Sequence, residues 1–365
     1  MQPPRQRHVG SGLTSRDRSA GAAARRGPRR GQAPYVGAAV AVGSTSVHFT
    51  AARLDPTGLQ VVGDASAFLS LGWVVDREGG LPSQVRTDLV DVLLEYKAQA
   101  SALGAASLTL VATEPLRRAS NAAEVADAVR EATGEPLHVL THDEEGLLAL
   151  LAVTGGDPPV RPLLLVDVGG GSTEFVVAGN GGQAATGSLN LGAARLTVAL
   201  VESDPPTPHE IEALRTRAGE AVGRVELQRI EGNRRPAGGR VVRFPARPPD
   251  RVDAAVFVGG TATNLTRIVP AATGDGVLTH RRLLSAYRTL GRMPAAEIAG
   301  RFGVTPLRAR ILPGGAAIVE AVMARYGVAR AQVSQLSLRE GVILVVARAG
   351  AAWRERLPEL LGGGP

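Results

Sequence analysis

Short apolar segments and longer amphipathic segments alternate along most of the chain, and their order occurs twice. Each time, three short segments rich in Val and Ala and broken by turn residues come first, which predicts a meander of strands. The strands expected in the two meanders are Val36–Val42, Val47–Leu54 and Gly58–Gly63, and then Leu163–Val168, Glu174–Val177 and Gln183–Leu189.

Helices that alternate with further strands are predicted after each meander. In the first half, the expected elements are Ser83–Ala102, Leu108–Ala112, Ala122–Ala132, Leu137–Leu140 and Asp143–Val153. In the second half, helices are expected from Ala193, from Pro208, at Thr261–Ile268, at Arg281–Leu290, at Pro306–Arg325 and from Leu338, with strands at Ala254–Val258 and Gln332–Ser334.

The repeated order predicts an α/β protein built from two duplicated lobes with a cleft between them. The same repeat is visible in individual residues. In both Val40–Ser46 and Val166–Thr173, an apolar strand is followed by glycine and then by small hydroxyl side chains. We expect residues 35–157 to form the N-terminal lobe, 158–355 the C-terminal lobe and 356–365 a flexible end.

Composition excludes several classes of protein. The 365 residues include no cysteine, which rules out a disulfide scaffold, a thiolate metal site and a cysteine nucleophile. No apolar run approaches the roughly 18 residues that a membrane span needs, and residues 1–34 lack the apolar core of a signal peptide. We therefore expect a cytoplasmic protein without a membrane partner.

The net charge of +7 belongs to residues 1–34, which hold eight arginines and one aspartate, while the remainder carries 33 basic and 33 acidic side chains. We expect this tail to be disordered, either as an arm for a polyanion or as a dispensable leader. A second arginine-rich segment, 229–251, indicates a solvated insertion, with a polyanion-guiding loop as the alternative. Because aromatic residues make up only 3% of the chain, stacking platforms are few and we expect no specific nucleic-acid partner.

The strongest local motif is Asp167–Glu174, in which an apolar strand delivers a carboxylate and three glycines then turn the chain. Glycines let backbone N–H groups approach an anion closely, which favours a phosphate site over an ordinary hairpin. Asp167 at the end of its strand is suited to holding hydrated Mg²⁺ beside those phosphates. The residues expected to contact phosphate here are Gly169, Gly170, Gly171, Ser172 and Thr173.

Two further glycine turns are candidates for the same chemistry. One follows the first predicted strand, and the other leaves a strand and enters a helix, where exposed N–H groups and the helix dipole attract anions. The residues expected to contact phosphate in these turns are Gly43, Ser44 and Thr45, and Gly259, Gly260 and Thr261.

Two adjacent glutamates begin a predicted helix. Thr141 and Glu144 have the spacing of a capping box, so Glu144 is expected to tie down the helix start. Glu145 has no such structural duty, and it is equally suited to a surface position and to the role of base for an attacking water.

Several ordered motifs together resemble the exopolyphosphatase/guanosine pentaphosphate phosphatase (Ppx/GppA) family, of the actin-like, sugar-kinase-like superfamily. The resemblance covers about Val36 to Ala347 and is specific because the motifs occur in the family's order. They are Ala112–Asn121, Glu144–Glu145, Asp167–Glu174, Ser188–Thr197, Gly259–Thr263 and Leu338–Gly341.

The resemblance implies two ribonuclease-H-like (actin-like) lobes and a hydrolase that releases terminal phosphate from inorganic polyphosphate or guanosine pentaphosphate. By position, Glu145 would be the water-activating base and Arg117 would neutralise charge on the transferring group. Asp167 and Glu174 would serve a Mg²⁺ site, with Mn²⁺ as the alternative ion. A homodimer is expected.

The chain also departs from the family pattern, most clearly where Ala41 replaces a metal-facing aspartate. This leaves three hypotheses open: a Mg²⁺-dependent hydrolase, a sensor that binds phosphate-rich ligands and catalyses poorly, and an ATP-using kinase of the same superfamily. The other departures are Thr45 for Asn, His142 for Gly, Leu147 for Arg, and Arg310 and Gln335 for Asp.

Overall fold

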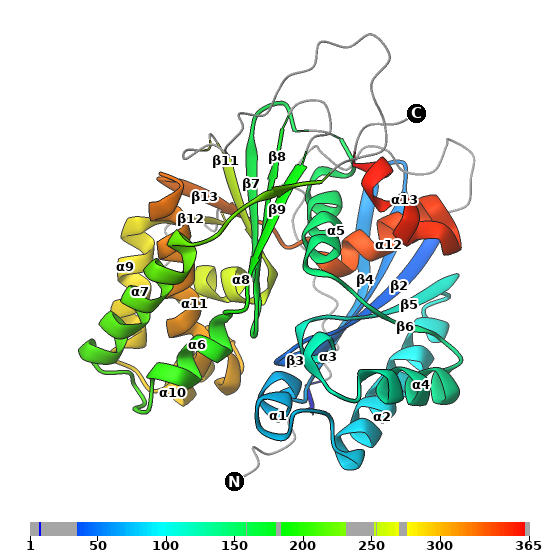
Figure 1. Ribbon diagram of the computed structural model, residues 1–365, viewed down its shortest axis with the longest axis horizontal. Helices are drawn as coiled ribbons and strands as arrows, with labels where there is room; N and C mark the ends of the chain where they lie inside the picture. Colours follow the sequence, from blue (N-terminus) through cyan, green and yellow to red (C-terminus); the bar gives the residue numbers. More distant parts are fainter. Residues whose placement is uncertain are drawn as a thin grey trace. The chain divides into compact units, whose positions relative to one another are not determined.

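The computed structural model describes residues 7–8, 35–157, 159–179, 184–230, 252, 254–269 and 276–361 (Figure 1). The chain divides into two compact units. Unit 1 comprises Met1–Asp157 and Leu338–Leu360, and unit 2 comprises Pro158–Ser337 and Leu361–Pro365. The predictions for most of the basic tail, for 231–251 and for 362–365 fall outside the described residues.

Unit 1 is built on a six-stranded mixed sheet with the order β1-β4-β3-β2-β5-β6. Strands β2, β3 and β4 form the expected antiparallel meander, and β5 and β6 continue the sheet in parallel with β2. The strands are β1 (Arg7–His8), β2 (Tyr35–Val42), β3 (Ser46–Asp55), β4 (Gly58–Phe68), β5 (Ser107–Ala112) and β6 (Leu137–Val139). The short β1 pairs with β4 inside the tail that was expected to be disordered.

The helices of unit 1 cover its sheet. Side chains from α1, α2, α3 and α4 join Val40, Val42 and Phe49 in one apolar core. The helices are α1 (Leu71–Glu78), α2 (Ser83–Ala102), α3 (Glu114–Arg118), α4 (Ala122–Thr133), α5 (His142–Thr154), α12 (Leu338–Ala349) and α13 (Trp353–Leu360), with a 3₁₀ turn at Gly350–Ala352.

Helix α12 corrects the predicted domain boundary. The chain does divide after Asp157, but Leu338–Leu360 belongs to unit 1 and not to the lobe expected at 158–355. The reason lies in the alternation of β2: Val40 and Val42 enter the core described above, so Gly37 faces the other way, where a Cβ would lie 3.0 Å from Ile343 of α12. An apolar helix does not reveal from its own sequence which sheet it covers.

Unit 2 is built on a seven-stranded sheet with the order β10-β9-β8-β7-β11-β13-β12. Its strands are β7 (Leu163–Val168), β8 (Thr173–Ala178), β9 (Ala184–Leu189), β10 (Gln228–Arg229), β11 (Ala254–Val258), β12 (Val277–Thr279) and β13 (Arg330–Val333). Its helices are α6 (Ala193–Leu200), α7 (Pro208–Gly223), α8 (Gly259–Ile268), α9 (His280–Leu290), α10 (Ala295–Phe302) and α11 (Pro306–Arg325).

The two sheets share one topology. In each, an antiparallel meander supplies three neighbouring strands, and two parallel strands extend the sheet on the side of the first, in the orders β4-β3-β2-β5-β6 and β9-β8-β7-β11-β13. The predicted α/β fold with two duplicated lobes is therefore confirmed.

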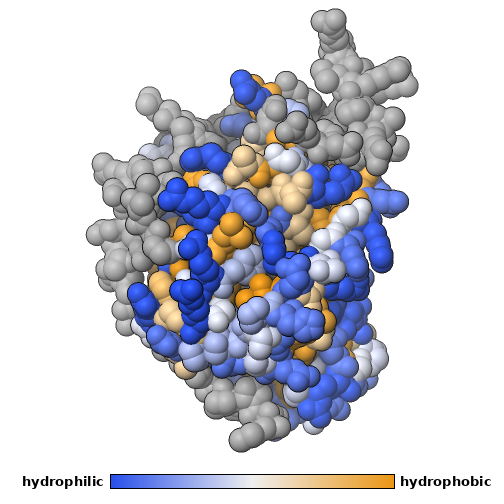
Figure 2. All heavy atoms as spheres, turned by 90° about the vertical axis from the view of Figure 1, so that its left-hand side faces the viewer, coloured by the Kyte–Doolittle hydropathy of each residue, from blue (hydrophilic) through white to orange (hydrophobic). Residues whose placement is uncertain are grey.

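The surface shown in Figure 2 is largely hydrophilic, with small hydrophobic areas between charged side chains. None of the helices in the described ranges combines the length and the hydropathy that crossing a bilayer requires.

Candidate active site

The first hairpin turns of the two units have the same backbone geometry. In unit 1 the N–H of Gly43 donates to the carbonyl of Ser46 at 3.1 Å, and in unit 2 the N–H of Gly169 donates to the carbonyl of Ser172 at 3.0 Å. A Cβ at either glycine would lie 3.0 Å from the accepting oxygen. The two sequence motifs that predicted phosphate loops thus form equivalent turns.

Side chains and neighbours hold the unit 1 turn in place. The hydroxyl of Ser44 donates to Glu114 Oε2 at 2.6 Å, and the carbonyl of Ser44 accepts from Gly72 N at 2.8 Å. The hydroxyl of Thr45 is buried and has no hydrogen-bond partner among the residues that the structure describes. A buried polar group without a partner costs roughly 1–3 kcal/mol, so this hydroxyl is a ready donor for a bound anion.

Glu114 was not among the candidates from the sequence. Its side chain is 2% exposed and also accepts from Arg118 Nε, whose Nη1 lies 2.7 Å from Asp76. The four-residue spacing of Glu114 and Arg118 on one helix was the available signal. No sequence pattern predicted the contact of Glu114 with Ser44, which lies 70 residues away in the chain.

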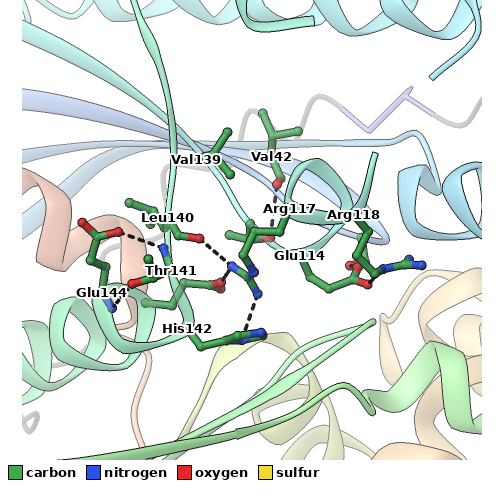
Figure 3. Close-up of polar contacts among 12 residues, drawn as sticks. Val42, Glu114, Arg117, Arg118, Val139, Leu140, Thr141, His142 and Glu144 are labelled. Atoms are coloured by element: carbon green, nitrogen blue, oxygen red, sulfur yellow. Dashed lines mark hydrogen bonds and ion pairs between the residues drawn. The ribbon is translucent and has the colours of Figure 1, made fainter. Parts of the chain in front are cut away.

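The two proposed catalytic residues of unit 1 are in contact, because Arg117 Nη1 donates to Glu145 Oε1. Arg117 Nη1 also donates to the carbonyl of Leu140 at 2.8 Å (Figure 3). Arg117 Nη2 donates to His142 Nδ1 at 2.9 Å. The side chains of Arg117 and Glu145 are 17% and 11% exposed, so the pair is well shielded from water.

His142 contributes as a neutral acceptor. Burial, and then the charge of Arg117, lower its pKa below the usual value of 6.5. An unprotonated Nδ1 is required to accept the hydrogen bond from Arg117. His142, which stands where the family has glycine, therefore adds a third contact that orients Arg117.

Glu144 has the structural role that the sequence predicted. Thr141 and Glu144 form a complete capping box, with Glu144 N donating to Thr141 Oγ1 at 3.2 Å and Thr141 N donating to Glu144 Oε2 at 2.8 Å. Burial opposes ionisation of this carboxyl, but Arg354 and Thr141 outweigh it and lower its pKa. The two adjacent glutamates thus have different partners.

In unit 2, the proposed metal-binding residues face each other. Asp167 and Glu174 are directly opposite partners in the β7–β8 pair, which places their Cβ atoms about 4.5–5.5 Å apart on one face of the sheet. Glu174 is 2% exposed, and Ser337 Oγ donates to Asp167 Oδ2 at 3.3 Å. Opposed carboxylates repel each other and offer the hard oxygen ligands that Mg²⁺ prefers, so they fit a divalent cation.

The third glycine turn adjoins this pair. Gly259 has a φ of +80°, and a Cβ there would lie 2.3 Å from Asp167 Oδ1. A Cβ at Gly260 would lie 3.1 Å from the guanidinium of Arg308, a side chain that is 9% exposed. Thr261, 1% exposed, continues helix α8. The sequence had not singled out Arg308 as part of this site.

Two carbonyl groups of the triple-glycine turn accept hydrogen bonds from the start of helix α6. Ala193 N donates to Gly169 O at 2.8 Å and Ala194 N to Gly170 O at 2.9 Å, which caps the start of α6. Gly192 has no room for a side chain, because a Cβ would lie 2.5 Å from the carbonyl carbon of Gly170. Thr173 Oγ1, a predicted phosphate contact, donates to Leu191 O at 2.7 Å.

The departures from the family pattern have structural counterparts. Ala41 and His48 occupy the register position in unit 1 that Asp167 and Glu174 occupy in unit 2. Arg310 donates to the carbonyls of Glu202, at 3.1 Å, and of Ser203. Remaining departures are the buried Leu147 and the exposed Gln335.

Comparison with known proteins identifies the family. Residues 50–348 match the Ppx/GppA phosphatase family. The chain belongs to this family. An exopolyphosphatase 1 of Mycobacterium bovis is 28% identical over 309 residues, which cover 83% of this chain and 86% of the relative.

Solved structures agree with this assignment. A Ppx/GppA family member from Aquifex aeolicus is 27% identical, with a TM-score of 0.67 over 86% of this chain and 97% of that chain. An exopolyphosphatase from Cytophaga hutchinsonii, 18% identical, shares the fold with a TM-score of 0.70 over 86% of this chain and 98% of that chain. The expected cleft concerns how the two units meet and stays a prediction.

Proposed function

We propose that this Ppx/GppA family phosphatase is a phosphoanhydride hydrolase that releases terminal phosphate from inorganic polyphosphate, with guanosine pentaphosphate as the alternative substrate. The observation that carries the proposal is the shielded contact of Glu145 with Arg117, which His142 and the Leu140 carbonyl orient. Exopolyphosphatase relatives support the choice of substrate class.

Glu145 acts as the base in this proposal. Its carboxylate, held by Arg117, would take the proton from the attacking water. Part of the rate would come from holding water and phosphate in line. Phosphoryl transfer depends mainly on such positioning and on electrostatic stabilisation.

Phosphate oxygens are bound by the glycine turns. The N–H groups of the turns at Gly43–Ser46 and Gly169–Ser172, the Thr45 hydroxyl and the start of α8 are the proposed donors. Asp167 and Glu174 would hold Mg²⁺ or Mn²⁺, which when bound neutralises charge on the phosphate oxygens.

A second candidate function rests on Ala41. Because unit 1 carries Ala41 and His48 where unit 2 carries two carboxylates, a site that needs metal ligands from both hairpins would be incomplete. The protein would then bind phosphate-rich ligands as a sensor and turn them over poorly.

The test is phosphate release from medium-chain polyphosphate and from guanosine pentaphosphate, with Mg²⁺ and with Mn²⁺. We expect turnover by the wild type and a loss of about 10²–10⁴-fold in Glu145→Gln, the usual contribution of a general base. Glu131→Gln, at an exposed glutamate of α4, is the matched control and should retain activity.

The other outcomes are distinct. A wild type without turnover that polyphosphate still stabilises against heat would establish the sensor, and recovery of activity in Ala41→Asp would trace the loss to that position. A wild type that neither hydrolyses nor binds these ligands would overturn both functions.

A further inference from the structure

Two arginines hold the segment that joins β6 to α5, and they do so in the same manner. Arg117 binds the carbonyl of Leu140 at 2.8 Å and the carboxylate of Glu145. A different arginine, from the C-terminal helix α13, binds the preceding carbonyl, of Val139, and the preceding glutamate, Glu144.

That second arginine is Arg354. Its Nε and Nη2 donate to Glu144 Oε1 and Oε2, both at 2.7 Å, and Nη2 also donates to the carbonyl of Val139 at 3.0 Å. Such a two-pronged contact between a guanidinium and a carboxylate fixes orientation as well as distance. The Glu144 carboxylate is thereby held by Arg354 and by Thr141 N, and the Glu144 N–H by Thr141 Oγ1.

Helix α13 is anchored by buried side chains on either side of Arg354. Trp353 is 3% exposed and Leu357 is 1% exposed. The ring of Trp353 meets the ring of His138 edge-on, with centroids 5.5 Å apart. Arg354 therefore extends from a fixed base next to the residues that it holds.

We propose that Arg354 is a positioning residue for Glu145, acting through Glu144 and the Val139 carbonyl. The proposal rests on the proposed function, in which Glu145 is the base. Glu144 and Glu145 are consecutive residues in the first turn of α5, so a shift of Glu144 rotates or translates Glu145 against Arg117. Reacting groups displaced by about 1 Å lose on the order of 10²-fold in rate.

The experiment compares Arg354→Ala and Arg354→Lys with Arg356→Ala. Arg356 lies on the same helix, in an exposed pair with Glu359 at 3.6 Å, and is the matched control. We expect kcat on polyphosphate to fall about 10–100-fold in Arg354→Ala while KM stays within about twofold, because positioning and not binding is lost. Arg354→Lys, which lacks the two-pronged contact, should recover only part of the loss.

Free guanidinium provides a readout that a general loss of stability would not give. Low millimolar guanidinium chloride should restore part of the kcat of Arg354→Ala and leave wild type and Arg356→Ala unchanged. The proposal is overturned by an unchanged kcat in Arg354→Ala, or by a loss that the control shares or that guanidinium leaves untouched.

Amide hydrogen exchange separates this proposal from the proposed function, because it needs no turnover. Exchange at residues 141–145 should speed up at least about tenfold in Arg354→Ala but not in Arg356→Ala. Unchanged exchange there overturns the positioning role even in an active enzyme. If the wild type proves inactive while this exchange effect appears, the proposed hydrolase fails and the anchoring of the α5 start by Arg354 stands.

Discussion

Gly341 of α12 lies directly against the main chain of Leu148 in α5, and a Cβ on Gly341 would lie only 1.9 Å from the Leu148 carbonyl oxygen. The obstacle is backbone, which cannot move aside as the end of a side chain can. The two helices therefore approach as closely as they do because position 341 has no side chain. Glu145 lies in the first turn of α5, so the packing of α12 against α5 helps to fix the helix that carries this candidate base.

Gly341→Ala should therefore destabilise unit 1. We expect the free energy of unfolding to fall by about 1–3 kcal/mol or more, the usual range for overpacking a close contact. Gly219→Ala is the control, because a Cβ there meets nothing within 4 Å inside helix α7, and it should stabilise by roughly 0.5–1 kcal/mol. Urea unfolding measures both, and equal effects would contradict the role given to Gly341.

Gly259→Ala should disturb metal binding. The new Cβ would lie 2.3 Å from Asp167 Oδ1, at a position whose φ of +80° already disfavours alanine. We expect the stabilisation by Mn²⁺ to weaken, measured as the shift in melting temperature on adding the ion. Gly300→Ala, at an open position of α10, should keep the wild-type shift. A full metal response in Gly259→Ala would argue against Asp167 as a ligand.

Asp167→Asn should have opposite effects with and without metal. Without a divalent ion, removing one of two directly opposed carboxylates should stabilise the fold by about 0.2–1 kcal/mol. The amide oxygen can still accept from Ser337, so the fold keeps that contact. With Mn²⁺ or Mg²⁺, the variant should lack the wild-type increase in melting temperature. Thermal melts with EDTA and with each ion test both statements.

Acidification should destabilise the protein through His138 and His142. Burial is the main cause that lowers the pKa of each below 6.5, and the charges of Arg354 and Arg117 respectively come second. The unfolded chain then binds more protons than the folded one as the pH falls below about 6.5, so stability is lost in that range. The upper limit for each histidine is about 1.4 kcal/mol per pH unit, and because both side chains are partly exposed, solvent screening should keep the loss below that limit.

The measurement for this dependence is urea unfolding between pH 8 and pH 5. His142→Gln and His138→Gln should each flatten the slope. A stability that rises on acidification across this range would mean that the folded state favours the charged imidazoles.

Glu114→Gln should loosen the unit 1 turn. The variant loses the ion pair with Arg118 and keeps only a neutral acceptor for Ser44. Because Glu114 is buried, we expect a loss of about 1–3 kcal/mol in the free energy of unfolding. Asp76→Asn, at the exposed end of the same network, is the control and should change stability by less than about 0.5 kcal/mol.

Local patterns carried most of the sequence-based predictions. The two meanders, the glycine turns and the capping box of Thr141 and Glu144 depend on residues close together in the chain, and the structure shows each of them. Short helices were missed: α1 and α3 span eight and five residues, and segments of that length owe their helical form to packing more than to their own pattern.

Contacts between segments that are distant in the chain could not be predicted from the sequence. Arg308 beside Gly260, Glu114 beside Ser44 and Arg354 beside Glu144 join residues on different elements. A single sequence shows that these side chains are charged, but it does not show which backbone will bring them together. The placement of α12 in unit 1 was missed for the same reason.

The division of unit 1 into two stretches of chain has a consequence for synthesis. A ribosome completes β2 to α5, and then makes almost all of unit 2, before α12 and α13 emerge. Until then the nascent unit 1 lacks the helix that covers β2 and α5, and Arg354 has not reached Glu144. Unit 1 is therefore begun before unit 2, but its chain is completed only after almost all of unit 2 has been made.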